Sequence, residues 1–253
     1  MSRLFLSLMW FLALYSLSFA GEWTVKDKHT LRFEGHIEKN DIPKFNELVS
    51  EDIKTIIVNC GGGDVLAAIP IAERIQSHKI DIIVDGICAS SCANYFFIAA
   101  NNKKVPKGSL FLLHGGITPM LEHKDQMVEY ITKAGGTPEQ IESYLKAWYD
   151  GAKKERDIYE KAGVDMSLLE YSYRATNGKY DFWAPPLATL KKLGVKNIIE
   201  FWYPTSDEEM NALSNKLRNE YAKKYTIHSS HLNIMGGDID QYKPEHKSTP
   251  LKK

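Results

Sequence analysis

The stretch that decides the fold is residues 55–77, which read TIIVNCGGGDVLAAIPIAERIQS. Its first four residues are all β-branched, a run that is typical of a strand buried in a parallel sheet. Three glycines follow, and residues 65–77 then have the pattern of a helix. We therefore predict a strand, a glycine-rich loop and a helix in succession, which is the repeating unit of an α/β fold.

The same alternation continues on both sides of this stretch. Residues 80–84 predict a second buried strand, and a turn at Gly86 leads into small residues that we expect to continue as a helix to Ala100. A third strand is predicted at residues 109–113. Before the stretch, the alternating residues 29–37 predict a half-buried strand, and residues 41–50 a helix. The fold class we expect is α/β with a mostly parallel sheet and flanking helices.

The second half of the chain adds helices to this core. Residues 119–175 are rich in Glu, Lys, Tyr and Met and predict two or three helices, which pack on the sheet or form a lid or a contact in a homo-oligomer. Residues 181–199 predict a loop, a short helix and a last strand, and residues 206–225 an amphipathic helix. The expected organisation is an α/β domain over 21–203 with a helical insert at about 119–175, a C-terminal helix and extension over 204–234, and a disordered tail over 235–253.

The first 20 residues differ from the rest. Arg3 is their only charged residue, residues 4–15 are almost entirely apolar, and small residues end the segment at Ala20. This pattern is typical of a cleaved secretory signal peptide. An uncleaved membrane anchor is the alternative, but the apolar run is shorter than the roughly 20 residues that span a bilayer. We therefore expect an exported protein, periplasmic or secreted, without a membrane span after cleavage.

The overall charge is balanced, with 32 basic and 32 acidic residues. Nothing in it favours nucleic acid or an anionic membrane surface as a partner. Hydrophobic residues make up 43% of the chain and charged residues 25%, as in ordinary globular proteins. The three cysteines do not have the spacing of a metal site, and we expect no metal or other cofactor.

Three loops carry candidate chemistry, each after a predicted strand, where ligands bind in open α/β sheets. The first, residues 59–64, contains Gly61 to Gly63, whose backbone N–H groups can approach a ligand closely. The second, residues 86–92, presents Ser90 and Ser91 at a strand-to-helix turn. The third begins with His114, the residue type that usually activates a serine hydroxyl. Taken singly, the glycines suit a turn, the serines suit a helix cap, and a lone histidine suits a structural role.

Their order and spacing resemble the Clp-protease-like branch of the crotonase superfamily. Asn59-Cys60-Gly61-Gly62-Gly63 resembles the Asn-Ser-Pro-Gly-Gly loop of that family, and Gly86-Ile87-Cys88-Ala89-Ser90 resembles its Gly-x-x-Ala-Ser turn. His114 falls where the catalytic histidine of the family falls. The Cys-Ala-Ser-x-Cys variant looks closer to exported bacterial relatives than to the cytosolic protease. The resemblance covers residues 30–116 well and 180–200 loosely.

The resemblance implies a role for each residue. Ser90 would attack an acyl carbon, His114 would act as its base, and the backbone N–H groups of Gly62 and Ser91 would form the oxyanion hole. Asp181 is the best match to the third member of the triad. Asp165 is a second candidate for that role, and Asp181 itself also suits a loop or helix-capping position. The implied substrate is a peptide or protein.

The chain departs from the family loop at two positions. Cys60 replaces serine, and Gly61 replaces proline, which removes rigidity from a loop that should be preorganised. Cys88 and Cys92 flank Ser90, and their spacing of four residues permits a disulfide marginally. We favour that pairing, with Cys60 as a rival partner for either cysteine or as a reactive thiol beside Ser90.

Three functions are compatible with these residues. The leading hypothesis is an exported serine hydrolase of the peptidase kind. The alternative is a catalytically inactive binding or scaffold protein that kept the fold, which the altered glycine loop favours. A crotonase-type enzyme acting on a thioester ranks last, because an exported protein would lack coenzyme A and such chemistry does not need a Ser90–His114 pair.

Overall fold

The computed structural model describes residues 21–176, 181–225 and 234–238. The predicted signal peptide, residues 1–20, lies outside the described residues, as does most of the predicted tail, residues 239–253. Within the described part of the chain, no helix is both long enough and apolar enough to cross a membrane.

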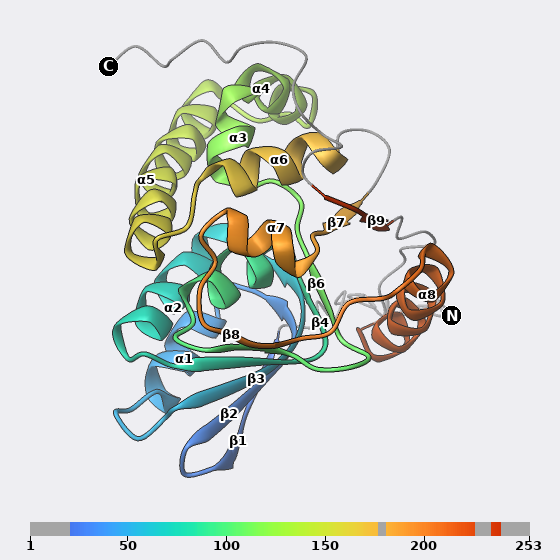
Figure 1. The fold of residues 1–253 in the computed structure, drawn as a ribbon. Helices are drawn as coiled ribbons and strands as arrows, with labels where there is room; N and C mark the ends of the chain where they lie inside the picture. Colours follow the sequence, from blue (N-terminus) through green and yellow to red (C-terminus); the bar gives the residue numbers. More distant parts are fainter. Residues whose placement is uncertain (1–20, 177–180, 226–233, 239–253) are drawn as a thin grey trace, which may run out of the picture.

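The fold is mixed α/β and is built on a seven-stranded sheet (Figure 1). Its strands follow the order β1-β2-β3-β4-β5-β8, and β6 also pairs with β4. Only β1 runs antiparallel to its neighbour, so the prediction of a mostly parallel sheet is confirmed. The strands are β1 (Glu22–Asp27), β2 (Thr30–Ile37), β3 (Thr55–Gly63), β4 (Asp81–Ala89), β5 (Lys103–Val105), β6 (Leu110–Leu112) and β8 (Ile198–Phe201).

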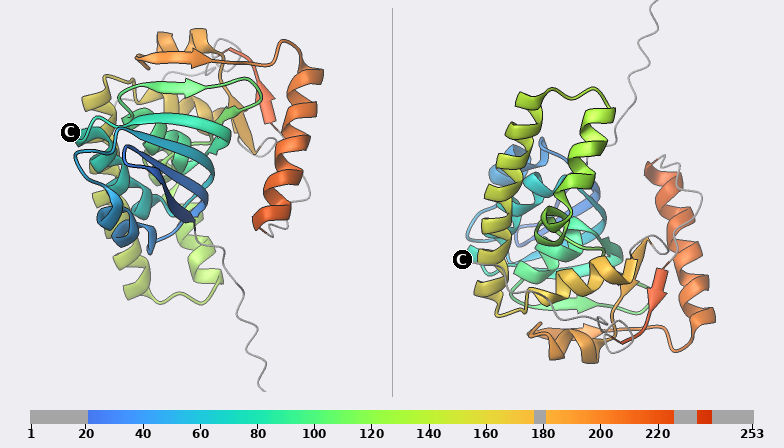
Figure 2. Two further views of the ribbon diagram at one scale, coloured as in Figure 1. Left: turned by 90° about the horizontal axis from the view of Figure 1, so that it is seen from below. Right: turned by 90° about the horizontal axis from the view of Figure 1, so that it is seen from above.

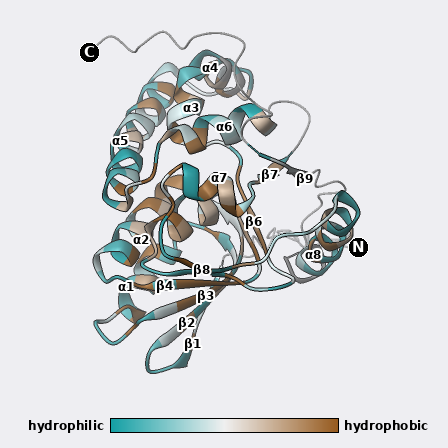
Figure 3. Ribbon diagram, in the orientation of Figure 1, coloured by the Kyte–Doolittle hydropathy of each residue, from teal (hydrophilic) through white to brown (hydrophobic). Residues whose placement is uncertain are grey.

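Helices lie on both sides of this sheet. They are α1 (Asp41–Leu48), α2 (Val65–Ser77), the π-helix η1 (Cys92–Phe97), α3 (Ile117–Glu122), α4 (Lys124–Lys133), α5 (Pro138–Ala162), α6 (Ser167–Thr176), α7 (Leu187–Lys192) and α8 (Asp207–Tyr225). The main core joins the sheet to α2, η1 and α5. A smaller core joins α8 to β4 and β6, and α8 stands apart from α1 and α2 in both views of Figure 2. Figure 3 shows apolar residues concentrated in the central strands and α2.

Local sequence signals account for where the main helices begin. The Asp64 carboxylate accepts a hydrogen bond from the Ala67 N–H at 3.0 Å and so caps α2. Thr137 and Gln140 form a reciprocal capping box at the start of α5. This cap explains the break at residues 135–138 that separates α4 from α5.

β4 pairs with two strands in succession along one edge. Its first half pairs with β5 at Ile82 and Ile83, and its second half pairs with β6 from Ile87 to Ala89. Ser109 bridges the two halves, because its hydroxyl donates to the Val84 carbonyl and accepts from the Gly86 N–H, both at 3.1 Å. We call this point the fork in the sheet. It directs the second half of β4, and the turn that follows, toward β6.

The structure differs from the sequence predictions in several elements. β3 and β4 extend beyond residues 55–58 and 80–84, because both strands continue through the loops that follow them. β5 was missed, since it is only three residues long and contains two lysines. The insert contains four helices, α3 to α6, rather than two or three.

The start of the predicted disordered tail needs correction. Residues 235 and 236 belong to β9 (Ile234–Gly236), which pairs with β7 (Phe182–Ala184) in a two-stranded parallel sheet. The Trp183 indole N–H donates to the Gly237 carbonyl at 3.0 Å, and the Thr189 hydroxyl donates to the Asp238 carboxylate at 2.9 Å. These contacts are tertiary, so the polar sequence around them gave no sign of order.

Candidate active site

Ser90 and His114 lie in direct contact. The Ser90 Oγ is 2.6 Å from the His114 Nε2, which is a short hydrogen bond between a hydroxyl and a ring nitrogen. Ser90 sits between the end of β4 and η1, with φ of 54°, a value that is uncommon for a residue other than glycine. Its N–H donates to the Leu112 carbonyl at 3.0 Å, which ties the turn to β6. The strained turn therefore holds the hydroxyl beside the imidazole.

His114 follows β6 and is held from the side of β7. The residue before it, Leu113, exchanges two backbone hydrogen bonds with Trp183, of 2.8 and 2.7 Å. The Phe182 ring lies against the imidazole, with ring centroids 4.7 Å apart. His114 is exposed at one side, but the atoms packed around its ring reduce its hydration. This loss of hydration lowers the pKa of His114 below the ordinary value, and the negative charge of Asp181 acts in the opposite direction. A neutral imidazole is the form that can accept a proton from Ser90.

The two candidate acids have different surroundings. Asp181 directly precedes β7, and its charge reaches His114, where it favours the imidazolium form. Asp165 accepts a hydrogen bond from the Ser167 N–H at 2.9 Å at the start of α6. Asp165 thus caps the start of α6, and of the two acids Asp181 is the one whose charge acts on His114.

The glycine loop packs directly on the serine turn. A Cβ atom on Gly62, whose φ is 95°, would lie 2.4 Å from the Ser90 Cβ, so only glycine fits there. The Ser91 hydroxyl donates to the Gly63 carbonyl at 2.9 Å and fastens the loop to the turn. The Gly62 N–H donates to the Cys60 Sγ at 3.3 Å, and a thiol is a weak acceptor. In the structure this donor is therefore directed at the buried Cys60 sulfur.

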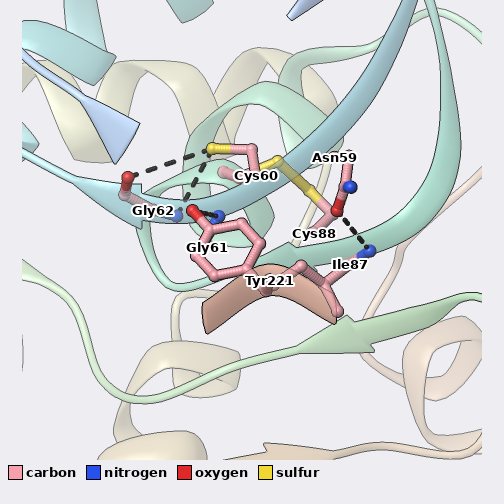
Figure 4. The surroundings of a disulfide bond; sticks show 8 residues. Asn59, Cys60, Gly61, Gly62, Ile87, Cys88 and Tyr221 are labelled. Atoms are coloured by element: carbon pink, nitrogen blue, oxygen red, sulfur yellow. Dashed lines mark hydrogen bonds between the residues drawn. A yellow bond between two sulfur atoms is a disulfide. The ribbon is translucent and has the colours of Figure 1, made fainter. Parts of the chain in front are cut away.

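The structure joins Cys88 and Cys92 in a disulfide that spans the turn of Ser90, with Cα atoms 5.3 Å apart. This is the pairing favoured from the sequence. Cys60 is a free, buried thiol on the neighbouring strand, where it faces Cys88 in the register of β3 and β4 (Figure 4). Burial raises the pKa of Cys60 to about 12, so its thiolate is scarce near neutral pH. The alternative of a reactive Cys60 is therefore not supported.

A buried carboxylate supports both halves of the site and was missed in the sequence. Glu155 of α5 is fully buried and accepts hydrogen bonds from the Tyr95 hydroxyl at 2.8 Å, from the Ile117 N–H at 2.9 Å, and from the N–H and hydroxyl of Thr118. Tyr95 lies in η1 after Ser90, and residues 117 and 118 follow the loop of His114. Glu155 thus links the two segments that carry the reactive residues. A single glutamate in an amphipathic helix gave no sequence signal of this role.

Two further residues fix the loop that follows His114. The Asn94 side-chain amide donates to the Gly115 carbonyl at 2.5 Å, and the Gly115 N–H donates to the Ser172 hydroxyl at 2.8 Å. Asn94 lies in η1 and Ser172 in α6. Through these contacts and those of Glu155, α5 and α6 of the helical insert hold the loop that follows His114 in place.

An apolar cavity of about 160 Å³ lies beside the segments that carry Ser90 and His114, although neither of these two residues lines it. Ala89 precedes the serine, Leu112 accepts its N–H, and Phe182 contacts the imidazole; all three line the cavity. Leu217 and Tyr221 of α8 form the opposite wall. The mainly apolar lining is suited to an aliphatic or aromatic group, and Arg218 adds one cationic side chain to it.

Over residues 21–176, 181–225 and 234–238, no three His, Cys, Asp or Glu side chains gather as a metal site requires. In comparisons with models of known protein families and with curated proteins, nothing matches this chain.

Proposed function

We propose that this chain is an exported serine hydrolase of the Clp-protease-like, crotonase-superfamily type, acting on peptide bonds. The observation that carries the proposal is the 2.6 Å contact between the Ser90 Oγ and the His114 Nε2. Its support is the strained conformation of Ser90, the arrangement that presents a nucleophile at a strand-to-helix turn. The order of the glycine loop, the serine turn and the histidine along the chain also supports the proposal, because it resembles the order in the Clp-protease-like branch.

The proposed reaction begins when the Ser90 oxygen attacks the carbonyl carbon and its proton passes to the His114 Nε2. The carbonyl oxygen becomes an oxyanion, which the N–H groups of Gly62 and Ser91 stabilise. When the C–N bond breaks, the imidazolium gives its proton to the leaving amine. Water then attacks the acyl-serine by the same route and releases the carboxylic acid. Asp181 stabilises the imidazolium that forms twice in this cycle.

The cavity and the disulfide add to the proposal. The apolar cavity beside Ala89 would receive an aliphatic or aromatic side chain of the substrate, next to the bond that is cut. The Cys88–Cys92 disulfide is of the kind that persists in oxidising compartments, which agrees with the secretory pattern of residues 1–20.

The test is covalent labelling of the purified mature protein with a fluorophosphonate, with the adduct located by mass spectrometry. We expect wild-type protein to be labelled at Ser90 and Ser90→Ala not to be labelled there. In His114→Ala the rate of labelling should fall by about 100-fold or more. Ser143→Ala is the control, because Ser143 is an exposed serine on α5. Unlabelled wild-type protein should also cut a peptide amide with an apolar residue before the scissile bond, and labelling at Ser90 should abolish this cleavage.

The second candidate is an inactive binding or scaffold protein. It is favoured by one observation, the hydrogen bond that the Gly62 N–H makes to Cys60 instead of facing an open oxyanion hole. Well-folded wild-type protein that never labels between about pH 6 and pH 9, a range centred on the pH where a neutral histidine acts as base, would establish this candidate in place of the hydrolase.

A further inference from the structure

The glycine loop is contacted by a tyrosine from the far end of the chain. Tyr221, near the end of α8, accepts a hydrogen bond from the Gly61 N–H at 2.9 Å across a separation of 160 residues. Its ring meets the His36 ring edge-on, with centroids 5.5 Å apart, and the residue is only 8% exposed. Figure 4 shows Tyr221 lying directly beside Gly61.

Tyr221 occupies the space that a side chain at position 61 would need. A Cβ atom on Gly61 would lie 2.7 Å from the Tyr221 hydroxyl oxygen and 2.9 Å from the Cζ atom. Gly61 is also the extra residue of a bulge, since Gly35 pairs with Cys60 and His36 already pairs with Gly62. The bulge leaves the Gly61 N–H outside the pairing of β2 and β3, and the tyrosine hydroxyl gives it an acceptor.

The contact with Tyr221 restrains the backbone at Gly61, where the sequence itself provides no rigidity. Proline fixes φ and has no N–H that needs an acceptor, whereas glycine has a free φ and an N–H donor. Of the three consecutive glycines at the end of β3, Gly62 and Gly63 pair with β2, whereas Gly61 has no partner in that ladder. The Tyr221 hydroxyl and ring restrain the first of them from outside the loop.

We propose that Tyr221 is a positioning residue for the oxyanion hole. It acts through the Cys60–Gly61 peptide, whose N–H it binds, and so keeps Gly62 packed against Ser90. The inference rests on the proposed hydrolase function. It assigns α8 a role in the site beyond forming a wall of the cavity.

The first test is Tyr221→Phe, which removes the hydroxyl and keeps the ring. We expect amide hydrogen exchange in residues 59–63 to accelerate about threefold to tenfold, the range for losing one hydrogen bond. The maximal rate of fluorophosphonate labelling at Ser90 should fall by a similar factor, with the half-saturating concentration unchanged. The control is Tyr149→Phe, which removes an exposed hydroxyl on α5 that accepts from the Lys124 ammonium and should change neither quantity.

The second test is a rescue. Gly61→Ala alone should slow labelling, because its Cβ would lie 2.7 Å from the Tyr221 hydroxyl oxygen. In the Tyr221→Ala background the same substitution should speed labelling, because alanine then restricts the backbone without a collision. The φ of Gly61 lies outside the left-handed region, so alanine is tolerated there. A purely structural role for Tyr221 would give losses of the same sign in both backgrounds.

The outcomes separate this inference from the proposed function. If the wild type labels at Ser90 but Tyr221→Phe changes neither exchange nor labelling, the positioning role is wrong and the hydrolase stands. If the wild type never labels, the hydrolase and the role in an oxyanion hole are both wrong. Faster exchange in Tyr221→Phe would then identify Tyr221 as a structural restraint alone.

Discussion

Glu155→Gln tests the buried network that joins the serine and histidine segments. The substitution keeps the size of the side chain but exchanges one carboxylate oxygen for an NH₂ group. Oε1 accepts from the Tyr95 hydroxyl and the Ile117 N–H, and Oε2 accepts from the N–H and hydroxyl of Thr118. A hydroxyl can turn to accept a hydrogen bond, but a backbone N–H cannot. Whichever oxygen is replaced, one backbone N–H loses its acceptor.

The expected loss of stability follows from the one backbone N–H that is left without an acceptor. A buried donor left without an acceptor costs about 1–3 kcal/mol, and the bonds that remain lose the strengthening that a charged acceptor provides. Together these losses should lower the free energy of unfolding by about 2–4 kcal/mol. That is a large share of the roughly 5–15 kcal/mol that stabilises a typical domain.

The assay is urea unfolding at neutral pH, followed by tryptophan fluorescence. The control is Glu160→Gln, an exposed glutamate on the same helix, which should change the free energy of unfolding by less than about 0.5 kcal/mol. Ser90 labelling should also slow in folded Glu155→Gln protein, because the loop after His114 loses its anchor. A loss of stability below about 1 kcal/mol would refute the reasoning, since a stranded buried N–H costs at least that much.

Three further predictions concern charge and the disulfide. Asp181→Asn removes the charge that favours the His114 imidazolium and so lowers the pKa of His114 further. The pH at which the labelling rate falls on the acid side should therefore move to a lower value. A move to a higher pH would contradict the proposed pairing of Asp181 with His114. Burial lowers the pKa of Lys103 to about 8 from 10.5, so the folded state binds fewer protons than the unfolded state between those values. Wild-type stability in urea should therefore rise more steeply over that pH window than the stability of Lys103→Met, by up to about 3 kcal/mol in total, and parallel curves would exclude the shift. Replacing Cys88 and Cys92 together by serine should lower the free energy of unfolding by about 2 kcal/mol, because the closed loop is short, and an unchanged urea midpoint would show that the bond contributes nothing.

The parts of the fold that could be predicted were those with a strong local signal. The β-branched run 55–58 and the helical pattern 65–77 specify β3 and α2 without help from the rest of the chain. Because β4 pairs with both β3 and β6, the ends of the three strands meet at one edge, and the loops that follow them come together. The proximity of Ser90 and His114 follows from this pairing, and the sequence predicted it through the order of the loops together with the family resemblance.

The residues that were missed have no local signal. Glu155 is one of many charged residues in α5, and only tertiary packing distinguishes it from its exposed neighbours. Tyr221 lies in a polar helix, 160 residues from the loop it contacts. The position of α8 depends on the small core that it shares with β4 and β6, which no periodicity in residues 207–225 could specify.

The fork in the sheet has a mechanical consequence. The first half of β4 belongs with β5 and β8, and its second half belongs with β6, so strain in the outer strands need not reach the segment that carries Ser90. Ser90 and His114 follow the two strands of the same hydrogen-bonded pair, and the Ser90 N–H also binds the Leu112 carbonyl. The two reactive groups would therefore move as one rigid body when the rest of the sheet twists, and their separation would vary less than the shape of the pocket around them.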